Sequence, residues 1–204
     1  MKQAELLGRL LGDGSVWRLK SLAEHGVTAA TVRRALAAGL VEQVSRGVYR
    51  AASVVRVADQ ELAELSARVS GCLVCLHSAA DFHGLGDMAS SRIWAALPAR
   101  RRTPNVEWPP VRFVHWSVRT RFEVGVETRS IAGVQVAMTD LARTVVDMVA
   151  CKALVGEERA LQCLRDYVAR GEPVAALSKV AEQVGWASRV APYLLSASVF
   201  GGPR

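Results

Sequence analysis

The sequence predicts an α+β fold, in which an N-terminal winged helix-turn-helix precedes a larger mixed α/β domain with a helical C-terminal half. Three observations predict it. Short segments with apolar residues at helical spacing open the chain. Two β-prone runs around a glycine-bearing turn follow at once. After residue 139 the pattern becomes helical almost to the end. The two domains are expected at residues 1–56 and 57–200.

The first three segments have the start and stop signals of short helices. The leucines within residues 6–11 form one apolar stripe, and the glycines that follow break it. A second helix is expected from Trp17 to Ala23, with Gly26 at its end. A third begins after Thr28, whose hydroxyl can cap it, and runs to about Ala38. Two short helices joined by such a turn form a helix-turn-helix.

A hairpin follows the third helix. Residues 40–44 and 48–50 are β-prone, and Ser45-Arg46-Gly47 between them is a turn. A helix-turn-helix followed directly by a two-stranded ribbon is a winged helix.

The larger domain begins as a mixture of helices and strands and ends as a run of helices. Its strands are expected to include a hairpin that turns at Ala132-Gly133. The expected helices are residues 57–69, 78–84, 140–150, 157–169, 173–184 and 187–197, and the expected strands are residues 92–97, 111–116, 124–131 and 134–138.

Charge is unevenly distributed along the chain. The 26 basic and 19 acidic residues give a net charge of +7 and a pI near 9.7. Residues 1–56 hold nine of the basic and four of the acidic residues, so most of the excess lies in the first quarter. A polyanionic partner is therefore expected to bind there.

Several classes of protein are disfavoured by the composition. No uninterrupted apolar stretch is long enough to span a membrane, and the N-terminus does not resemble a signal peptide, so a cytoplasmic protein is expected. Four cysteines are too few for a secreted disulfide framework, which favours reduced thiols. Without a glycine-rich phosphate loop, nucleotide binding has no support, and no cofactor is expected.

The third helix is the expected DNA-reading element, because the second helix of a helix-turn-helix enters the major groove. Its spacing predicts an outward stripe of Ala30, Thr31, Arg34 and Ala37, with Arg33 beside it. Arg34 and Thr31 are expected to meet base edges, since arginine can bind guanine with two hydrogen bonds and threonine can reach a polar edge or a thymine methyl group. Arg33 is expected to meet phosphate.

The hairpin is expected to supply a further DNA contact. Arg46 lies at its tip beside Gly47, from where a long cation can reach the backbone or the minor groove. An ordinary solvated surface is the alternative for each cation taken alone. The predicted DNA-binding residues are Arg18, Lys20, Thr28, Thr31, Arg33, Arg34, Arg46 and Arg50.

A second group of arginines lies in the larger domain, where it forms either another basic surface or a solvated loop. The group is Arg100, Arg101, Arg102, Arg112, Arg119 and Arg121.

Two arrangements resemble chemical sites but have simpler explanations. Cys72 and Cys75 have the spacing of a metal or redox pair, yet no second pair exists and the residues between them are apolar, so buried structural thiols rather than a metal site are expected. Asp81 and His83 stand two residues apart on one helix and point in different directions, which argues against acid–base catalysis. No catalytic residue is predicted.

A third arrangement is explained by helix stability. Asp140 stands at a helix N-terminus, and Arg143 stands four residues before Asp147. Capping and an intrahelical ion pair account for all three residues.

Taken together, these segments resemble the AbiEi antitoxins of type IV toxin–antitoxin systems. The resemblance covers nearly the whole chain in family order. It rests on Gly39-Leu40-Val41 with Arg46-Gly47-Val48-Tyr49, on residues 77–80 with His83-Gly84-Leu85, on Arg92-Ile93-Trp94, and on Thr139 with residues 141–147.

The resemblance implies a bacterial regulator, not an enzyme, whose winged helix represses its own operon at inverted repeats in double-stranded DNA. It also implies that the larger domain counteracts a cognate nucleotidyltransferase toxin. We expect a monomer in solution that does not bind membranes. Cys72 and Cys75 depart from the family pattern, which leaves a metal or redox role open.

Two other classes remain. One is a one-component transcription factor whose larger domain binds a small ligand, and a neighbouring nucleotidyltransferase gene would argue against it. The other is an enzyme that modifies the toxin, and an unchanged toxin mass after co-expression would argue against that.

Overall fold

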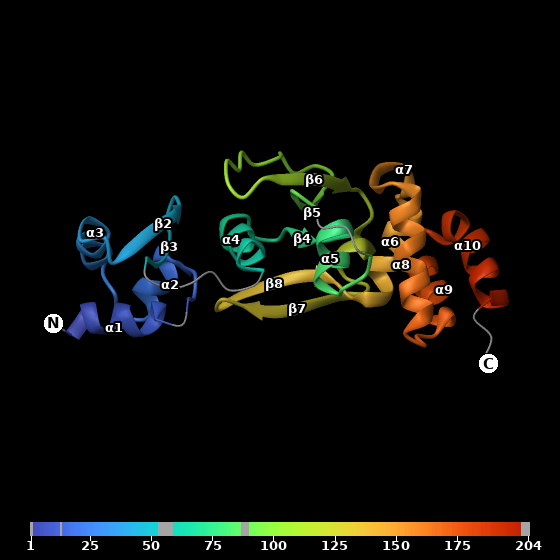
Figure 1. The fold of residues 1–204 in the computed structure, drawn as a ribbon. Helices are drawn as coiled ribbons and strands as arrows, with labels where there is room; N and C mark the ends of the chain where they lie inside the picture. The colour runs from blue at the N-terminus through green and yellow to red at the C-terminus, as the bar shows by residue number, and fades with distance from the viewer. Residues whose placement is uncertain (1, 13, 53–58, 87–89, 201–204) are drawn as a thin grey trace. The chain divides into compact units, whose positions relative to one another are not determined.

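The computed structural model describes residues 2–12, 14–52, 59–86 and 90–200 and divides into two compact units (Figure 1). Unit 1 comprises Met1–Gly71 with Thr128–Val136, and unit 2 comprises Cys72–Glu127 with Ala137–Arg204. The predicted α+β fold is confirmed, with a small three-stranded sheet among the N-terminal helices, a larger mixed sheet and a helical C-terminal region. The predicted domain boundary at residue 56 lies outside the described residues.

Unit 1 has the predicted winged helix. Its helices are α1 (Lys2–Leu11), α2 (Leu19–Glu24), α3 (Ala29–Ala37) and α4 (Gln60–Arg68). Its strands are β1 (Trp17–Arg18), β2 (Val41–Ser45) and β3 (Val48–Ala51), which form an antiparallel sheet in the order β1-β3-β2. We call the β2–β3 hairpin the wing.

The second helix begins later than predicted. Trp17 belongs to β1, where it pairs with Tyr49, and the helix starts at Leu19. The prediction that Trp17 opens the helix is wrong, because the apolar spacing of such a short segment fits a strand followed by a helix equally well.

A common apolar core holds these short elements together. Helix α2 has six residues, which is too short to be stable alone in water. Packing therefore stabilises it, and each buried Leu or Val contributes roughly 1.5–3 kcal/mol. The buried residues of this cluster are Leu7, Leu11, Leu22, Val27, Val32, Val41 and Tyr49.

The tip of a second hairpin completes unit 1. Ala132 and Gly133 have φ angles of +46° and +72°, as a two-residue type I′ turn requires, and the hairpin predicted here is confirmed. The amide of Val16 donates to the carbonyl of Ala132 over 2.8 Å. Val16 also packs with Val134 in a small apolar cluster. The tip therefore contributes both a hydrogen bond and apolar contacts to unit 1.

The larger sheet has the strand order β6-β5-β4-β8-β7. Strand β4 is antiparallel to β5 and parallel to β8, while β5 and β6 are parallel. The sequence pattern missed β4, because two fully buried residues show no alternation between faces. The strands are β4 (Leu73–Val74), β5 (Ile93–Pro98), β6 (Val111–Trp116), β7 (Val126–Ile131) and β8 (Val134–Thr139).

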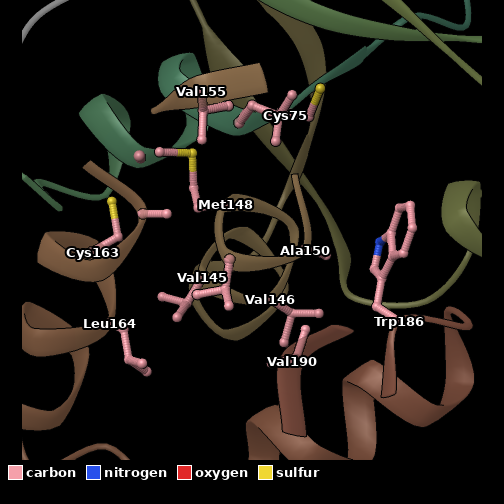
Figure 2. Packing of buried hydrophobic residues seen from close by; sticks show 14 of the residues in the cluster. Cys75, Val145, Val146, Met148, Ala150, Val155, Cys163, Leu164, Trp186 and Val190 are labelled. Carbon is pink, nitrogen blue, oxygen red and sulfur yellow. The ribbon is translucent and has the colours of Figure 1, made fainter. Parts of the chain in front are cut away.

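Helix α6 forms the centre of the unit 2 core. Val145, Val146 and Met148 are buried on it, and the neighbouring helices contribute Leu164 and Val190 (Figure 2). The helices of unit 2 are α5 (Leu76–Phe82), the 3₁₀ helix η1 (Arg119–Phe122), α6 (Leu141–Ala150), α7 (Lys152–Val155), α8 (Glu157–Ala169), α9 (Val174–Gln183) and α10 (Ala187–Phe200).

Most predicted helices of unit 2 are confirmed within a few residues, whereas η1 and α7 were missed because single turns carry little periodicity. Among the described residues, no helix combines the length and apolar character needed to cross a lipid bilayer.

Candidate nucleic-acid interface

Helix α3 is fixed at both of its ends. The side chain of Thr28 accepts a hydrogen bond from the amide of Thr31 over 3.3 Å, so the predicted N-cap is confirmed. After the helix, Gly39 adopts a φ of +66°, a conformation that glycine reaches without strain. Val32 anchors the inward face with 1% of its surface exposed. The outward residues of α3 are therefore presented on a well-anchored helix.

Four residues form that outward face: Ala30, Arg33, Arg34 and Ala37, all exposed. The helical rotation of about 100° per residue places the two alanines at its centre and one arginine on each side. Because alanine is small, base edges could approach the helix closely between the two cations.

Thr31 does not belong to the outward face, so the prediction of its orientation is wrong. It is 4% exposed, and its hydroxyl donates to Gln3 Oε1 of α1 over 2.7 Å. One residue after Ala30, the helix has turned by about 100° toward α1. A side chain buried in this way cannot reach a base edge without leaving its partner. Gln3 could not be identified from the sequence, because a partner 28 residues away leaves no local signal.

The two arginines of the face differ in their surroundings. Arg34 Nε donates to the carbonyl of Ala30 and its Nη2 donates to Thr31 Oγ1, each over 3.4 Å. Arg33 makes no hydrogen bond or ion pair with any described residue. Arg33 is therefore placed as well as Arg34 to contact DNA.

The wing presents one more cation. Arg46 is exposed in the turn between β2 and β3, next to Gly47, whose φ is +75°. The carbonyl of Gly47 accepts a hydrogen bond of 2.8 Å from the amide of Leu19, which ties the turn to the start of α2. Nearby on the chain, Lys20 is exposed, whereas Arg18 is partly buried and donates to the carbonyl of Ser66 over 3.4 Å.

Arg50, which was predicted to contact DNA, is paired with two carboxylates. Its Nη1 donates to Glu64 Oε1 over 2.6 Å, and its Nε is paired with Glu42. The Arg50 side chain is 13% exposed and that of Glu64 only 2%. The sequence could not show this contact, because Glu64 comes from α4, beyond the wing. Arg50 joins the wing to α4.

Replacing Arg50 with Met is expected to destabilise unit 1 by roughly 3 kcal/mol, because the buried carboxylate of Glu64 loses its ion pair with Arg50. Urea unfolding followed by circular dichroism measures this. The double variant R50M/E64Q should recover most of the loss, since it leaves no buried charge. If R50M is as stable as the parent but binds DNA more weakly, the arginine acts on DNA and not on the fold.

The second group of arginines is only partly brought together. Strands β5 and β6 run parallel with Pro98 opposite Trp116, so the segments that follow them leave from the same edge of the sheet. Arg100 and Arg102 are exposed there, and Arg101 is half-buried. Arg119, on the segment after β6, is paired with Glu123 over 2.6 Å.

The remaining two arginines of this group pack on aromatic rings. Arg112 lies at the other end of β6, with its guanidinium 4.4 Å from the centre of the Trp94 ring. Arg121 lies 3.5 Å from the ring centre of Trp186 and donates to the carbonyl of Val184 over 3.0 Å. Such cation–π contacts contribute about 0.5–2 kcal/mol to stability. Arg121 is half-buried and serves the fold of unit 2.

The cap and the intrahelical ion pair predicted at the start of α6 are confirmed. Asp140 caps α6 by accepting from the amide of Arg143 over 2.8 Å, and Arg143 Nε pairs with Asp147 Oδ1 over 2.9 Å. Cys72 and Cys75 are buried, and neither is part of a disulfide. Burial and the neighbouring Asp147 raise the pKa of Cys75 well above its usual value, so this thiol is a poor nucleophile.

Unit 2 also contains a cavity of about 530 Å³ between α5 and α8. Its lining includes His77, whose imidazole donates from Nε2 to the carbonyl of Val155 over 3.2 Å. Burial and the nearby Arg159 lower the pKa of His77, so the ring is neutral at pH 7. Within the described ranges, no group of three His, Cys, Asp or Glu side chains could hold a metal ion.

Comparisons with known proteins agree with this fold. The crystal structure of the RV2827C protein from Mycobacterium tuberculosis is similar, with a TM-score of 0.55 and 19% sequence identity over 97% of this chain and 82% of that chain. At this identity the similarity concerns the fold alone. No curated protein matches the chain. Residues 17–52 match the family model described as "Transcriptional regulator, AbiEi antitoxin". This segment extends from β1 through the wing, so the similarity to the AbiEi family of antitoxins and transcriptional regulators lies in the winged helix.

Proposed function

We propose that this chain is an antitoxin that represses its own operon by binding inverted-repeat DNA through α3 and the wing. Unit 2 is proposed to counteract a cognate nucleotidyltransferase toxin. The protein acts without a cofactor and without catalysis, as a monomer in solution that binds the two half-sites of an inverted repeat as two copies.

The outward face of α3 carries this proposal. It combines Arg33 and Arg34 with two alanines on a helix that is capped and buried on its other side. Arg46 adds a cation on the anchored turn of the wing. All of these residues lie within the segment that matches the regulator family. Lys20 and Arg18 are proposed to contact phosphate at the edge of this surface.

The proposal is tested by two measurements on the full-length protein. Fluorescence anisotropy compares a duplex taken from directly upstream of its own gene with a shuffled duplex of the same composition. If a nucleotidyltransferase gene lies next to the gene of this chain, growth of cells that express it, with and without this chain, measures protection. Equal affinity for the two duplexes contradicts operator recognition, and unrelieved growth arrest contradicts antitoxin action.

Arg34 and Arg46 are expected to differ in what they contribute. R34A should lose about 1–3 kcal/mol of discrimination between the operator and the shuffled duplex, as expected for a bidentate guanine contact. R46A should lower the affinity for both duplexes by nearly the same factor, because a phosphate contact carries no sequence information. R33A shows whether the base contact comes from the other side of the same face. Unchanged discrimination in both R33A and R34A would exclude α3 as the reading element.

The salt dependence of binding tests the second group of arginines. Raising the salt concentration should weaken operator binding steeply, because cations that neutralise phosphates release counter-ions. If Arg100 and Arg102 also touch DNA, the R100A/R102A variant should reduce the slope of log K against log salt by up to about 1.8. An unchanged slope would show that these two residues do not contact DNA and face the toxin or solvent instead.

The unit 2 cavity favours one alternative, a one-component transcription factor that binds a small ligand there. Its size is that of small-molecule sites, and its lining combines carboxylates, Arg159 and apolar side chains. Protection against the neighbouring toxin would argue against this alternative. A toxin whose mass changes on co-expression would instead indicate an enzyme.

A further inference from the structure

We infer that unit 1 contains a second site, a groove between α1 and α3 that binds an amphiphilic carboxylate and thereby competes with DNA for Arg34. The binding site is independent of the proposed function, whereas its regulatory effect rests on it.

The groove has a volume of about 510 Å³, within the range of small-molecule sites. Small residues keep it open on the side of α1, where Ala4, Gly8 and Gly12 line it. A Cβ atom added to Gly8 would meet no atom within 4 Å. The space is therefore not filled by any neighbouring described side chain at this point.

One end of the groove is polar and carries positive charge. Gln3 Oε1 accepts two hydrogen bonds, from the hydroxyls of Thr31 and Thr28 over 2.7 and 3.0 Å, so the two N–H donors of the Gln3 amide are left for a ligand. Arg34 uses Nε and one terminal nitrogen for contacts of 3.4 Å and has further N–H donors free. Among the residues that the structure describes, the lining of the groove includes no carboxylate. An anionic group is therefore the complementary ligand for this end.

The rest of the groove is apolar. Leu7, Leu11, Ala35 and Val41 line it, and Leu40 stands at its rim with 66% of its surface exposed. The two ends together select a molecule with an apolar tail and a carboxylate head, such as a medium-chain fatty acid.

Occupation of the groove would oppose DNA binding. Arg34 also lies on the outward face of α3, so a carboxylate held by its guanidinium occupies donors that a base would use and adds negative charge near the phosphates. Since such a ligand binds only the DNA-free protein, it raises the apparent Kd for the operator by the factor 1 + [ligand]/Kd of the ligand. At a ligand concentration nine times the Kd of the ligand, the apparent Kd for the operator should rise about tenfold.

Direct binding is tested first, on the full-length protein by calorimetry with sodium decanoate as the probe. Gly8→Leu fills the groove, and Gly8→Ala is its matched control, because both substitutions replace a helical glycine and should favour the helix. The parent and G8A should bind decanoate, while G8L should bind at least tenfold more weakly. Decanol, which lacks the carboxylate, should bind the parent more weakly than decanoate does, and R34A should remove that difference.

Competition is then measured by anisotropy with the upstream duplex. Decanoate should raise the apparent Kd for the parent and G8A but not for G8L. Equal binding of decanoate to the parent and G8L, or no binding at all, overturns the site. Sedimentation that shows a dimer for the parent and a monomer for G8L would assign the groove to a second copy and also overturn it. If decanoate binds but leaves the affinity for the operator unchanged, the regulatory step is overturned. If the protein binds no operator at all, the proposed function is contradicted, and the calorimetry still tests the groove.

Discussion

Replacing Arg143 with Met is expected to lower the free energy of unfolding of unit 2 by about 3–5 kcal/mol, because the buried carboxylate of Asp147 loses its counter-ion. Both side chains are 0% exposed, and they are joined over 2.9 Å. Arg143 also donates to the backbone carbonyls of Val124 and Arg121 over 2.6 and 3.1 Å. These carbonyls would lose a donor in the same substitution, while Met roughly keeps the volume.

The loss of unfolding free energy caused by R143M should depend on pH. Burial raises the pKa of Asp147 above its usual 3.8, although Arg143 and Trp186 oppose the shift. A carboxyl group whose pKa is raised in the folded state contributes its full stabilisation below pH 3.8, the pKa of the unfolded state. This stabilisation is lost as the pH rises through the folded-state pKa. Without Arg143 the pKa of Asp147 should rise further. The destabilisation by R143M should therefore be smaller at pH 5 than at pH 7.

Urea unfolding at both pH values measures the effect. The double variant R143M/D147N is the control, since it removes the buried charge and keeps an oxygen that can accept from Trp186 Nε1, now 3.1 Å from Asp147 Oδ1. It should be more stable than R143M. A loss below about 1 kcal/mol, or strictly additive effects of the two substitutions, would show that the pair contributes little.

Local signals in the sequence were sufficient for α3 and for the wing. Thr28 begins α3 and Gly39 follows its end, because capping and positive φ depend on residues close in the chain. The same holds for the turn at Ala132-Gly133 and the ion pair of Arg143 with Asp147, whose members are at most four residues apart.

The sequence did not reveal partners that are distant along the chain. Thr31 was assigned to DNA but is held by Gln3, and Arg50 was assigned to DNA but is paired with Glu64. The sequence around a positively charged residue is the same whether its side chain binds a DNA phosphate or a carboxylate from another helix. The cations of the candidate site could thus be found from sequence, but the distinction between free and paired cations required the fold.

The extent of unit 1 decides how the two proposed activities can be separated. A fragment that ends near residue 56 lacks α4 and the hairpin tip, although Glu64 and Ala132 both contact the winged helix. Such a fragment is too incomplete to separate the two proposed activities. Substitutions on the surface of the full-length protein separate them better.

The triple variant R33A/R34A/R46A is therefore expected to lose operator binding and keep protection against the toxin. All three side chains are exposed, and none contributes to the apolar core of unit 1, so the fold should be unchanged. Operator affinity should fall at least about a hundredfold, or roughly 2.7 kcal/mol, because a base contact alone contributes about 1–3 kcal/mol. Protection should remain, since the variant leaves unit 2 intact.

The control removes the same positive charge from unit 2, in R92A/R165A/K179A, whose three side chains are also exposed. This control should bind the operator with an affinity close to that of the parent, which separates local contacts from the effect of net charge. Anisotropy measures DNA binding, growth of toxin-expressing cells measures protection, and circular dichroism checks the fold of each variant. If the N-terminal triple variant is folded and fails to bind the operator but also fails to protect, toxin control requires the DNA-binding surface. The two activities would then not be divided between the two units.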